Sequence, residues 1–509
     1  MSMILFALVV ACTCISQAAD YARIEREVAV SDRAIADGQA ALRDRVSLSD
    51  YADRVRRVDG REIWTEAFQA ALDGHEIVVV PARAEKYWLD ATVVVPSHRR
   101  IEATGATVAL SPGVKTVMLR NEHVVDGTLA PVPSGSRDSD IAVVGGRWED
   151  NCTSRAGYGR SGMFNTGPRQ VGNYYGVSAL FLFCNVDRFS VRDAMFVRCG
   201  GFAVQSAEGE GRLFRGIRFE DCFADGLHLN GNLTHVHAAD VRGKVGDDLV
   251  ALNAYDWLNS SICFGPQRFV LCEDLELELK DGRGYPAIRI QPAVYRYRDG
   301  SKVDCRISDV IFRRVKGITT YKMYLQTPAY TVGEAPEWGE VGSGGNLFFE
   351  DLDIDLDRPI DMLGEYAASQ APRGHFGAFE FGANLSDVTI RNVRIAFHAD
   401  RWPLTHLLCV GPKSCTGLKA DGGVTEYFDP YVSCTVGTVR VENLTVRGVP
   451  PRDLVHASSF SDVNGDGRST GRGMVGTVKI GSGRVAGVVS VLDDADGPVR
   501  EPREVNAKR

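Results

Sequence analysis

The sequence predicts an all-β protein built as a parallel β-helix, in which each coil of the chain stacks on the coil before it. Beyond Pro81 helical periodicity almost disappears, and short runs alternate apolar and polar residues between Gly, Asn and Asp. Unequal spacing between repeated units favours a solenoid whose coils of about 20 to 25 residues carry insertions, over a propeller. A β-sandwich is the structural alternative. The repeated unit is Asp or Asn, then apolar, variable and apolar residues, and it begins at Asp274, Asp309, Asp351, Asp387, Asn392 and Asn443.

The composition is that of an ordinary globular chain, with 44% hydrophobic and 24% charged residues among 509. A sizeable core is therefore expected. The formal net charge of -8 and the scattered basic residues provide no phosphate-binding stripe, so we expect no nucleic-acid partner. No mature segment has 18 consecutive apolar residues, which argues against an integral membrane span. We expect a monomer.

The N-terminal segment has the pattern of an export signal. Residues 4–15 form an apolar run, and small residues follow it within 16–19. This pattern predicts that residues 1–19 are a cleavable signal peptide and that the protein is secreted or otherwise extracytoplasmic, for example periplasmic. Cys12 ends a Val-Val-Ala-Cys stretch similar to a bacterial lipoprotein box, which makes a lipid anchor the alternative. Residues 20–60 are predicted to be a helical or linker segment.

A helix is predicted to cover the first coil of the solenoid. Its apolar residues recur at helical spacing, and Gly74 ends it. Because an open solenoid end exposes unpaired backbone, a helix at residues 61–74 is expected to cap it. The solenoid itself is predicted over 61–457, with loops at 134–176, and 458–509 are predicted to form Gly-rich strands and a charged tail. The helical apolar positions are Ile63, Trp64, Ala67, Phe68, Ala71 and Leu72.

Cysteines and metal-site patterns give weak signals. Ten cysteines outside the signal are too few for a disulfide scaffold, although Cys409 and Cys415 bracket a short segment that one bridge could close. Asp462 to Asp466 begins like a calcium loop, but Gly473 stands where the bidentate glutamate belongs. We therefore expect no metal and no other cofactor.

One acidic pattern occurs twice within residues 224–253. Asp225 precedes the apolar stretch 227–230, and Asp247 and Asp248 precede the similar stretch 249–253. Residues one coil apart share a column of a solenoid, so Asp225 and Asp247, 22 positions apart, are expected on adjacent coils with both side chains facing outward. Three neighbouring carboxylates repel one another, which raises the pKa of at least one of them, so that an acid and a base coexist.

Such a cluster has the groups that glycoside hydrolysis needs. One carboxylic acid protonates the leaving oxygen, and a carboxylate activates water across a gap of about 6.5 to 9.5 Å in inverting enzymes. An Asp-Asp pair alone carries no information, since Asp493 and Asp494 form another. Asp is also a common turn residue, so a structural role for Asp225 is the alternative. The paired spacing favours catalysis.

The two stretches resemble the acidic motifs of the polygalacturonase family of glycoside hydrolases. They read Ala-Asp-Gly-Leu-His-Leu at 224–229 and Gly-Asp-Asp-Leu-Val-Ala-Leu at 246–252. The resemblance implies a right-handed parallel β-helix and hydrolysis with inversion, with Asp247 as general acid and Asp225 and Asp248 positioning and deprotonating the water. The family's Gly-His-Gly motif does not follow Asp248, and Ala-Ile-Arg-Ile-Gln at 287–291 is similar to its Arg-Ile-Lys strand.

Further polar side chains alternate with apolar ones and are predicted to bind substrate on one exposed face. A solvated face without function is the alternative for Arg289, Gln291, Lys322 and Tyr324. Asparagine stacking at the coil corners is the alternative for His228, Asn230 and Asn253. Arg289 fits either the rung of the missing histidine or that of the basic strand. His375 and Glu380 lie among aromatic residues suited to stacking on a sugar ring, or simply to filling the core. The predicted substrate-binding residues are His228, Asn230, Asn253, Arg289, Gln291, Lys322, Tyr324, His375 and Glu380.

The sequence therefore predicts a glycoside hydrolase that acts on a polysaccharide or oligosaccharide without a cofactor. A polysaccharide lyase on the same architecture, with Arg or Lys as base, is one alternative. A carbohydrate-binding solenoid whose acidic residues only stabilise turns is the other.

Overall fold

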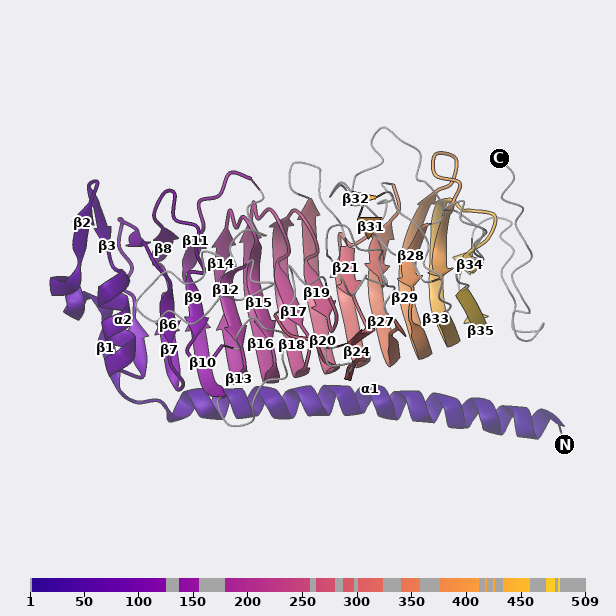
Figure 1. Cartoon of the computed structure of the whole chain (residues 1–509). Helices are drawn as coiled ribbons and strands as arrows, with labels where there is room; N and C mark the ends of the chain where they lie inside the picture. Colours follow the sequence, from indigo (N-terminus) through magenta and orange to yellow (C-terminus); the bar gives the residue numbers. More distant parts are fainter. Residues whose placement is uncertain are drawn as a thin grey trace.

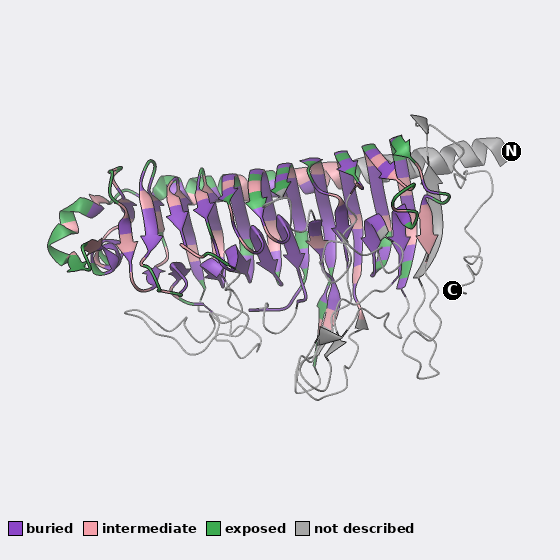
Figure 2. Cartoon of the chain, turned by 90° about the horizontal axis from the view of Figure 1, so that it is seen from above, coloured by how far each residue is buried: buried purple, intermediate pink, exposed green. Residues whose placement is uncertain are grey.

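The computed structural model describes residues 2–124, 137–154, 179–256, 262–279, 287–296, 301–323, 340–357, 376–411, 417–418, 424–425, 434–457, 473–480 and 484–485. Over these residues the chain is a right-handed parallel β-helix with an N-terminal capping helix, as predicted (Figure 1). The strands of the solenoid are mostly buried along its length (Figure 2). Among the described helices, α1 (Ser2–Ala41), η1 (Leu48–Arg54) and α2 (Thr65–Gly74), none is long and apolar enough to cross a membrane.

Sheet B carries the candidate site and takes one strand from each successive coil. All its pairings are parallel, so side chains in equivalent positions form columns along the solenoid. In spatial order its strands are β6 (Val93–Val95), β9 (Leu119–Asn121), β12 (Ala179–Cys184), β15 (Phe202–Ala207), β17 (Leu227–Asn230), β19 (Val250–Asn253), β21 (Ala287–Ile290), β25 (Thr320–Lys322), β28 (Phe376–Phe381), β30 (Thr405–Val410) and β34 (Val455–Ala457).

Sheet A supplies the rest of each coil, and only the β2–β3 hairpin interrupts its described parallel pairings. Its strands are β1 (Arg45–Ser47), β2 (Arg56–Val58), β3 (Arg61–Ile63), β4 (Ile77–Val79), β5 (Tyr87–Leu89), β7 (Arg99–Glu102), β8 (Thr107–Leu110), β10 (Asp138–Val144), β11 (Arg147–Glu149), β13 (Val186–Arg192), β14 (Met195–Val197), β16 (Gly209–Glu220), β18 (Leu233–Val245), β20 (Gln267–Leu279), β24 (Ile307–Lys316), β27 (Ser343–Asp355), β29 (Asn384–His398), β33 (Cys434–Val449), β35 (Gly473–Ile480) and β36 (Arg484–Val485).

Two small antiparallel groups complete the described strands. They are β22 (Ala293–Arg296) with β23 (Lys302–Cys305) and β26 (Glu340–Val341), and β31 (Gly417–Leu418) with β32 (Val424–Thr425). The predicted loop 134–176 contains strands β10 and β11, so that prediction was wrong for 138–149. The run 141–148 in this range has the apolar alternation of a strand. Cys409 is buried, and Cys415 lies outside the described residues, so the predicted bridge between them stays a prediction.

The repeated Asp and Asn units mark bends in the long strands of sheet A. Asp274, Asp351, Asn392 and Asn443 have φ near +55°, a left-handed conformation that Asn and Asp tolerate better than other side chains. Nδ2 of Asn392 donates to Oδ1 of Asp351 at 2.9 Å, and Nδ2 of Asn443 donates to Oδ1 of Asn392 at 2.9 Å. The unit therefore fixes a corner of each coil rather than a functional site.

The capping helix α2 replaces a missing neighbour strand at the edge of sheet B. It begins at Thr65, four residues later than predicted, because 61–63 pair with β2 as strand β3. Its Ala67 and Phe68 are fully buried. Oε1 of Gln69 accepts from the N–H of Val94 at 2.9 Å, and Nε2 of Gln69 donates to the carbonyl of Val94 at 3.0 Å. This amide satisfies the backbone of edge strand β6 as a strand would.

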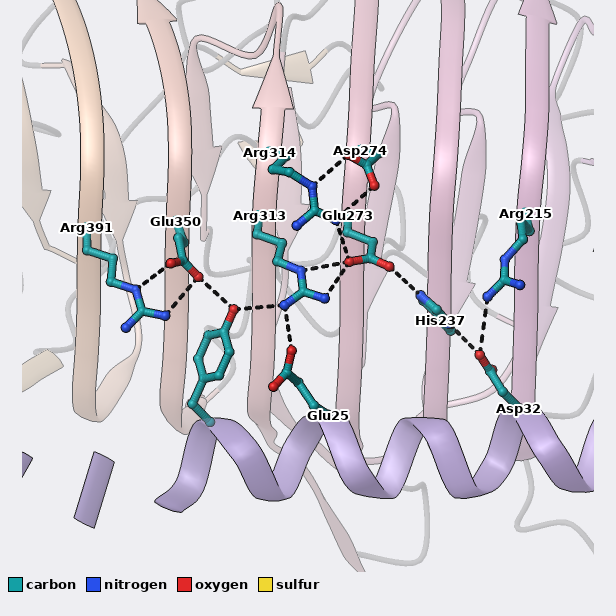
Figure 3. A network of polar contacts seen from close by, with 11 residues as sticks. Glu25, Asp32, Arg215, His237, Glu273, Asp274, Arg313, Arg314, Glu350 and Arg391 are labelled. Carbon is teal, nitrogen blue, oxygen red and sulfur yellow. Dashed lines mark hydrogen bonds and ion pairs between the residues drawn. The ribbon is translucent and has the colours of Figure 1, made fainter. Parts of the chain in front are cut away.

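Helix α1 runs along the outside of sheet A and contacts strands β10, β13, β16, β18, β20, β24 and β27 (Figure 1). One helical turn rises about 5.4 Å and one coil about 4.8 Å, so successive turns meet successive coils. Ile24 and Val28 are buried against apolar side chains of this face. Asp32 lies 2.7 Å from Nδ1 of His237, and Glu25 2.6 Å from Nη1 of Arg313 (Figure 3).

Candidate active site

One column of sheet B is polar in four of five successive coils. His228 pairs with Ala251, Ala251 with Arg289, Arg289 with Lys322, and Lys322 with Glu380 on β28. Their apolar neighbours on the same strands belong to the core. Alternation along each strand therefore holds this column on the side of sheet B that faces away from the core. Arg289 lies on β21, which pairs directly with β19. It therefore stands on the coil immediately after Asp247 and Asp248, and this decides between the two rungs that the sequence left open.

The three predicted aspartates come together where β17 and β19 begin. One carboxylate oxygen from each of Asp225, Asp247 and Asp248 lies within 4.8 Å of the others. The predicted offset was wrong by one residue, because Leu227 pairs with Val250 and the coil is thus 23 residues long. Asp248, rather than Asp247, continues the column of Asp225, and its N–H donates to Oδ1 of Asp225 at 3.3 Å.

His228 links Asp225 to a second carboxylate. Its Nδ1 lies 2.6 Å from Oδ2 of Asp225, and its Nε2 lies 3.1 Å from Oδ2 of Asp256. The ring stacks on Phe202 with centroids 3.6 Å apart and planes 4° apart. Burial lowers the pKa of His228, but the hydrogen bonds to Asp225 and Asp256 outweigh burial and raise the pKa to about 9. The imidazole is therefore cationic at neutral pH.

Asp248 contacts two cations. Nζ of Lys322 lies 2.8 Å from its Oδ1, and Nε of Arg289 lies 3.2 Å from its Oδ2. Burial raises the pKa of Asp248 to about 6, with Lys322 and Arg289 opposing the rise and Asp247 and Asp225 adding to it.

The cluster is buried, contrary to the exposed face that was predicted. Asp225 is 2% exposed and Asp248 is fully buried, whereas Asp247 is 7% exposed and is the most accessible of the three carboxylates. His228 and Lys322 are each 1% exposed. Facing away from the core therefore does not make these side chains accessible.

The other predicted binding residues surround this cluster. Nδ2 of Asn253 donates to Oδ2 of Asp256 at 2.8 Å, and Oδ1 of Asn230 accepts from Nε2 of Gln205 at 2.8 Å. Glu380 accepts from the N–H of Gly377 at 3.1 Å. The fully buried Gln291 joins β19 and β21 through its backbone. Tyr324 and His375 lie outside the described residues.

Asp256 and Phe202 belong to the site and were missed by the sequence reading. Asp256 was not among the predicted site residues, yet it is 2% exposed and contacts both His228 and Arg289. The available signal was its place three residues after Asn253, where β19 ends. Phe202 stands in a run of apolar strand residues that gave no sign of its stacking role.

Charge in the cluster is unbalanced when every group is ionised. The four carboxyl groups are those of Asp225, Asp247, Asp248 and Asp256, and the three cations are His228, Arg289 and Lys322. One negative charge is therefore in excess within a buried volume. Burial is the largest cause of the raised pKa of Asp248, and the carboxylates of Asp247 and Asp225 add to the rise. The arrangement can hold a transferable proton beside ionised carboxylates.

No family model matches the chain, and no curated protein matches its sequence. Among solved structures it is similar to an exopolygalacturonase from Thermotoga maritima, with 11% identity, 82% of this chain and 96% of that chain covered, and a TM-score of 0.44. It is also similar to the family 28 exopolygalacturonase of Yersinia enterocolitica (12% identity, 81% and 76% covered, TM-score 0.41). The tailspike protein of an E. coli bacteriophage, solved with a pentasaccharide, matches at 12% identity with 81% and 65% covered and a TM-score of 0.45. The function is argued from the site itself.

Proposed function

We propose that this protein is a glycoside hydrolase that cleaves glycosidic bonds of a polysaccharide or oligosaccharide. The observation that carries the proposal is the buried group of three aspartates, each with an oxygen within 4.8 Å of the others, together with a pKa of Asp248 of about 6. General acid and base catalysis require one carboxyl group that is protonated and another that is ionised near the working pH.

The roles follow from the contacts of each carboxylate. Asp247 is the most exposed of the three, which suits a general acid that must reach the leaving oxygen. His228 contacts Asp225. Lys322 and Arg289 contact Asp248. These contacts fix the two carboxylates in place, where they position and deprotonate the attacking water in the proposed mechanism.

The stereochemical outcome is a separate part of the proposal. The resemblance in residues 224–252 implies inversion. One oxygen from each of the three aspartates lies within 4.8 Å of the others. This separation is smaller than the gap of about 6.5 to 9.5 Å between the two carboxyl groups of inverting enzymes, and it is nearer to the roughly 5 to 5.5 Å found in retaining enzymes. Proton NMR of the first product anomer distinguishes inversion from retention, and we expect the inverted anomer. A retained anomer would mean that one of the carboxylates assigned to water activation acts as a nucleophile instead.

A lyase is less well supported by the same contacts. Its base would be Arg289 or Lys322, and both contact Asp248 as cations. Burial lowers the pKa of Arg289, but Asp248 and Asp256 outweigh burial and raise it above its usual value. Products that absorb in the near ultraviolet would nevertheless identify a lyase.

The decisive variant is Asp247→Asn, assayed on a panel of polysaccharides for new reducing ends. Loss of the proton donor is expected to reduce kcat by roughly 10²- to 10⁴-fold, with an unchanged circular dichroism spectrum. Asp353→Asn, an exposed aspartate paired with Arg394 on sheet A, is the matched control and should keep full turnover. Unchanged turnover in Asp247→Asn would exclude Asp247 as the acid, and glycan binding without new reducing ends in wild type would favour a binding protein.

We also propose that the chain is exported after cleavage behind residue 19. The contacts of α1 with sheet A described above come from residues 20–41, which cleavage retains. Mass spectrometry of the exported protein is expected to show Asp20 as its first residue, whereas a lipid on Cys12 would add acyl mass to a longer chain.

A further inference from the structure

His228 lies between two carboxylates that come from neighbouring coils. Asp225 precedes β17 in its own coil, and Asp256 follows β19 in the next. We propose that Asp256 is a positioning residue that holds the His228 ring so that Nδ1–H is donated to Asp225, which fixes this carboxylate beside Asp247 and Asp248. For its effect on turnover the proposal rests on the hydrolase function, whereas the state of the ring is independent of it.

The number of N–H groups that the His228 ring needs for its contacts supports this role. Two nitrogen–carboxylate contacts, at 2.6 and 3.1 Å, need a proton on each nitrogen, because a carboxylate oxygen only accepts. A neutral ring has one N–H and would present a lone pair to the other carboxylate. The competing arrangement is a neutral His228 whose Nε2 accepts from Nδ2 of Asn230, 3.2 Å away. These two arrangements differ by one proton.

The surroundings leave the ring little freedom to turn. Phe202 stacks on one face of it, and the residue opposite His228 on β19 is the small Ala251. The small side chain leaves room between His228 and Arg289, and Asp256 bridges these two, with Oδ1 lying 3.5 Å from Nη1 of Arg289.

Asp256 is itself held in place, since Nδ2 of Asn253 donates to its Oδ2 at 2.8 Å. Of the remaining charged groups on this side of sheet B, Asp248 contacts Arg289 and Lys322, and Glu380 stands on the rung beyond Lys322. Asp256 is therefore the described carboxylate that faces Nε2 of His228.

The consequence for Asp225 is a fixed orientation. Its Oδ2 accepts from His228, and its Oδ1 accepts from the N–H of Asp248. Without the charge of Asp256, the ring loses one of its two anionic partners and releases its second proton more readily. The contact that orients Asp225 then weakens, although no group that would touch the substrate has changed.

Two measurements on the full-length protein test the proposal. The first is a pH titration of histidine ring nitrogens by ¹⁵N NMR, with His228 assigned by its loss in His228→Gln, in wild type, Asp256→Asn and the control Asp353→Asn. His228 is expected to carry two protons at pH 7 in wild type and in the control. In Asp256→Asn its titration midpoint should fall by roughly 1 to 3 pH units. The second measurement is kcat and KM at pH 6, where kcat of Asp256→Asn should fall about 10- to 100-fold with little change in KM.

Each outcome is decisive for one of the two proposals. A neutral His228 at pH 7 in wild type, or a midpoint that Asp256→Asn leaves unchanged, would overturn the role of Asp256. An equal loss of kcat and gain in KM with an unchanged ring titration would also overturn it. Absence of turnover on every glycan would refute the hydrolase function, while the ring titration would still decide the positioning role. The titration of wild-type His228 remains a test of the proposal even if the Asp256→Asn variant does not fold.

Discussion

Lys322 places its ammonium nitrogen 2.8 Å from Oδ1 of Asp248, although the two residues lie on coils separated by β21. Lys322 is 1% exposed and Asp248 is fully buried. A buried charge without a partner is costly, so this pair ties the stability of the site to the register of three stacked coils.

Lys322→Met is expected to destabilise the protein in a pH-dependent way. Removing the cation raises the pKa of Asp248 further above its present value of about 6. A carboxyl whose folded pKa is raised loses stability as pH rises from its unfolded pKa to its folded pKa. The deficit of the variant should therefore be small at pH 5 and reach about 2 to 3 kcal/mol by pH 8, because one proton over two pH units is worth about 2.7 kcal/mol.

Urea unfolding at both pH values measures this effect, and Lys322→Arg, which keeps the charge, is the control. A deficit that is equal at pH 5 and pH 8 would show that the lost interaction does not involve the ionised form of Asp248.

The contact between His237 and α1 gives a second pH dependence. Burial lowers the pKa of His237, but Asp32 and Glu273 outweigh burial and raise it above 6.5. A histidine with a raised folded pKa contributes its full stability below the unfolded pKa of 6.5 and loses it as pH rises through the folded pKa. The interaction of Asp32 with His237 should thus be worth about 1 to 3 kcal/mol at pH 6 and close to nothing once the ring is neutral.

A double-mutant cycle of Asp32→Asn and His237→Gln measures that interaction, with unfolding free energies at pH 6 and at pH 9. Asp32 also lies 3.4 Å from Arg215, and the cycle removes this contribution from the coupling energy. A coupling energy that does not fall between the two pH values contradicts a charged His237 in the folded state.

Much of the site could be predicted because a solenoid converts sequence spacing into columns. The alternation of Leu227, His228 and Leu229 indicates which side chain leaves the core, and the recurrence of aspartates one coil apart brings them together. The offset was wrong by one residue because the length of a coil includes its bends, which hydrophobic alternation does not register. Burial of the site was missed for a related reason, since alternation indicates only which side of the sheet a side chain faces and not how exposed it is.

Contacts between distant segments could not be predicted in this way. Asp32 and His237 are brought together by the docking of α1, and neither carries a pattern that indicates the other. Asp256 lies beyond the end of β19, where strand periodicity stops. Gln69 occupies a helix face and satisfies a strand edge, a role that depends on where α2 packs.

The aspartate cluster should not need a divalent cation. One oxygen from each of Asp225, Asp247 and Asp248 lies within 4.8 Å of the others, a spacing that could hold an ion. Both oxygens of Asp248 already face cations, however, and a metal ion would be repelled by Lys322 and Arg289. Excess EDTA is expected to leave Tm and turnover unchanged. A rise in Tm of several degrees with submillimolar calcium or manganese, lost in Asp247→Asn, would show instead that the cluster binds metal.

Gln69→Ala should destabilise the solenoid from its N-terminal end. The change removes both hydrogen bonds to Val94 and leaves the N–H and carbonyl of the buried edge strand β6 without these partners. Loss of a partner for a buried polar group costs about 1 to 3 kcal/mol, so the free energy of unfolding should fall by about that amount. Glu66→Ala, a more exposed position on the same helix, is the control and should change it by less than about 0.5 kcal/mol. Hydrogen exchange should show faster exchange of the Val94 amide in Gln69→Ala, and an unchanged rate would mean that the side chain of Gln69 does not cap sheet B.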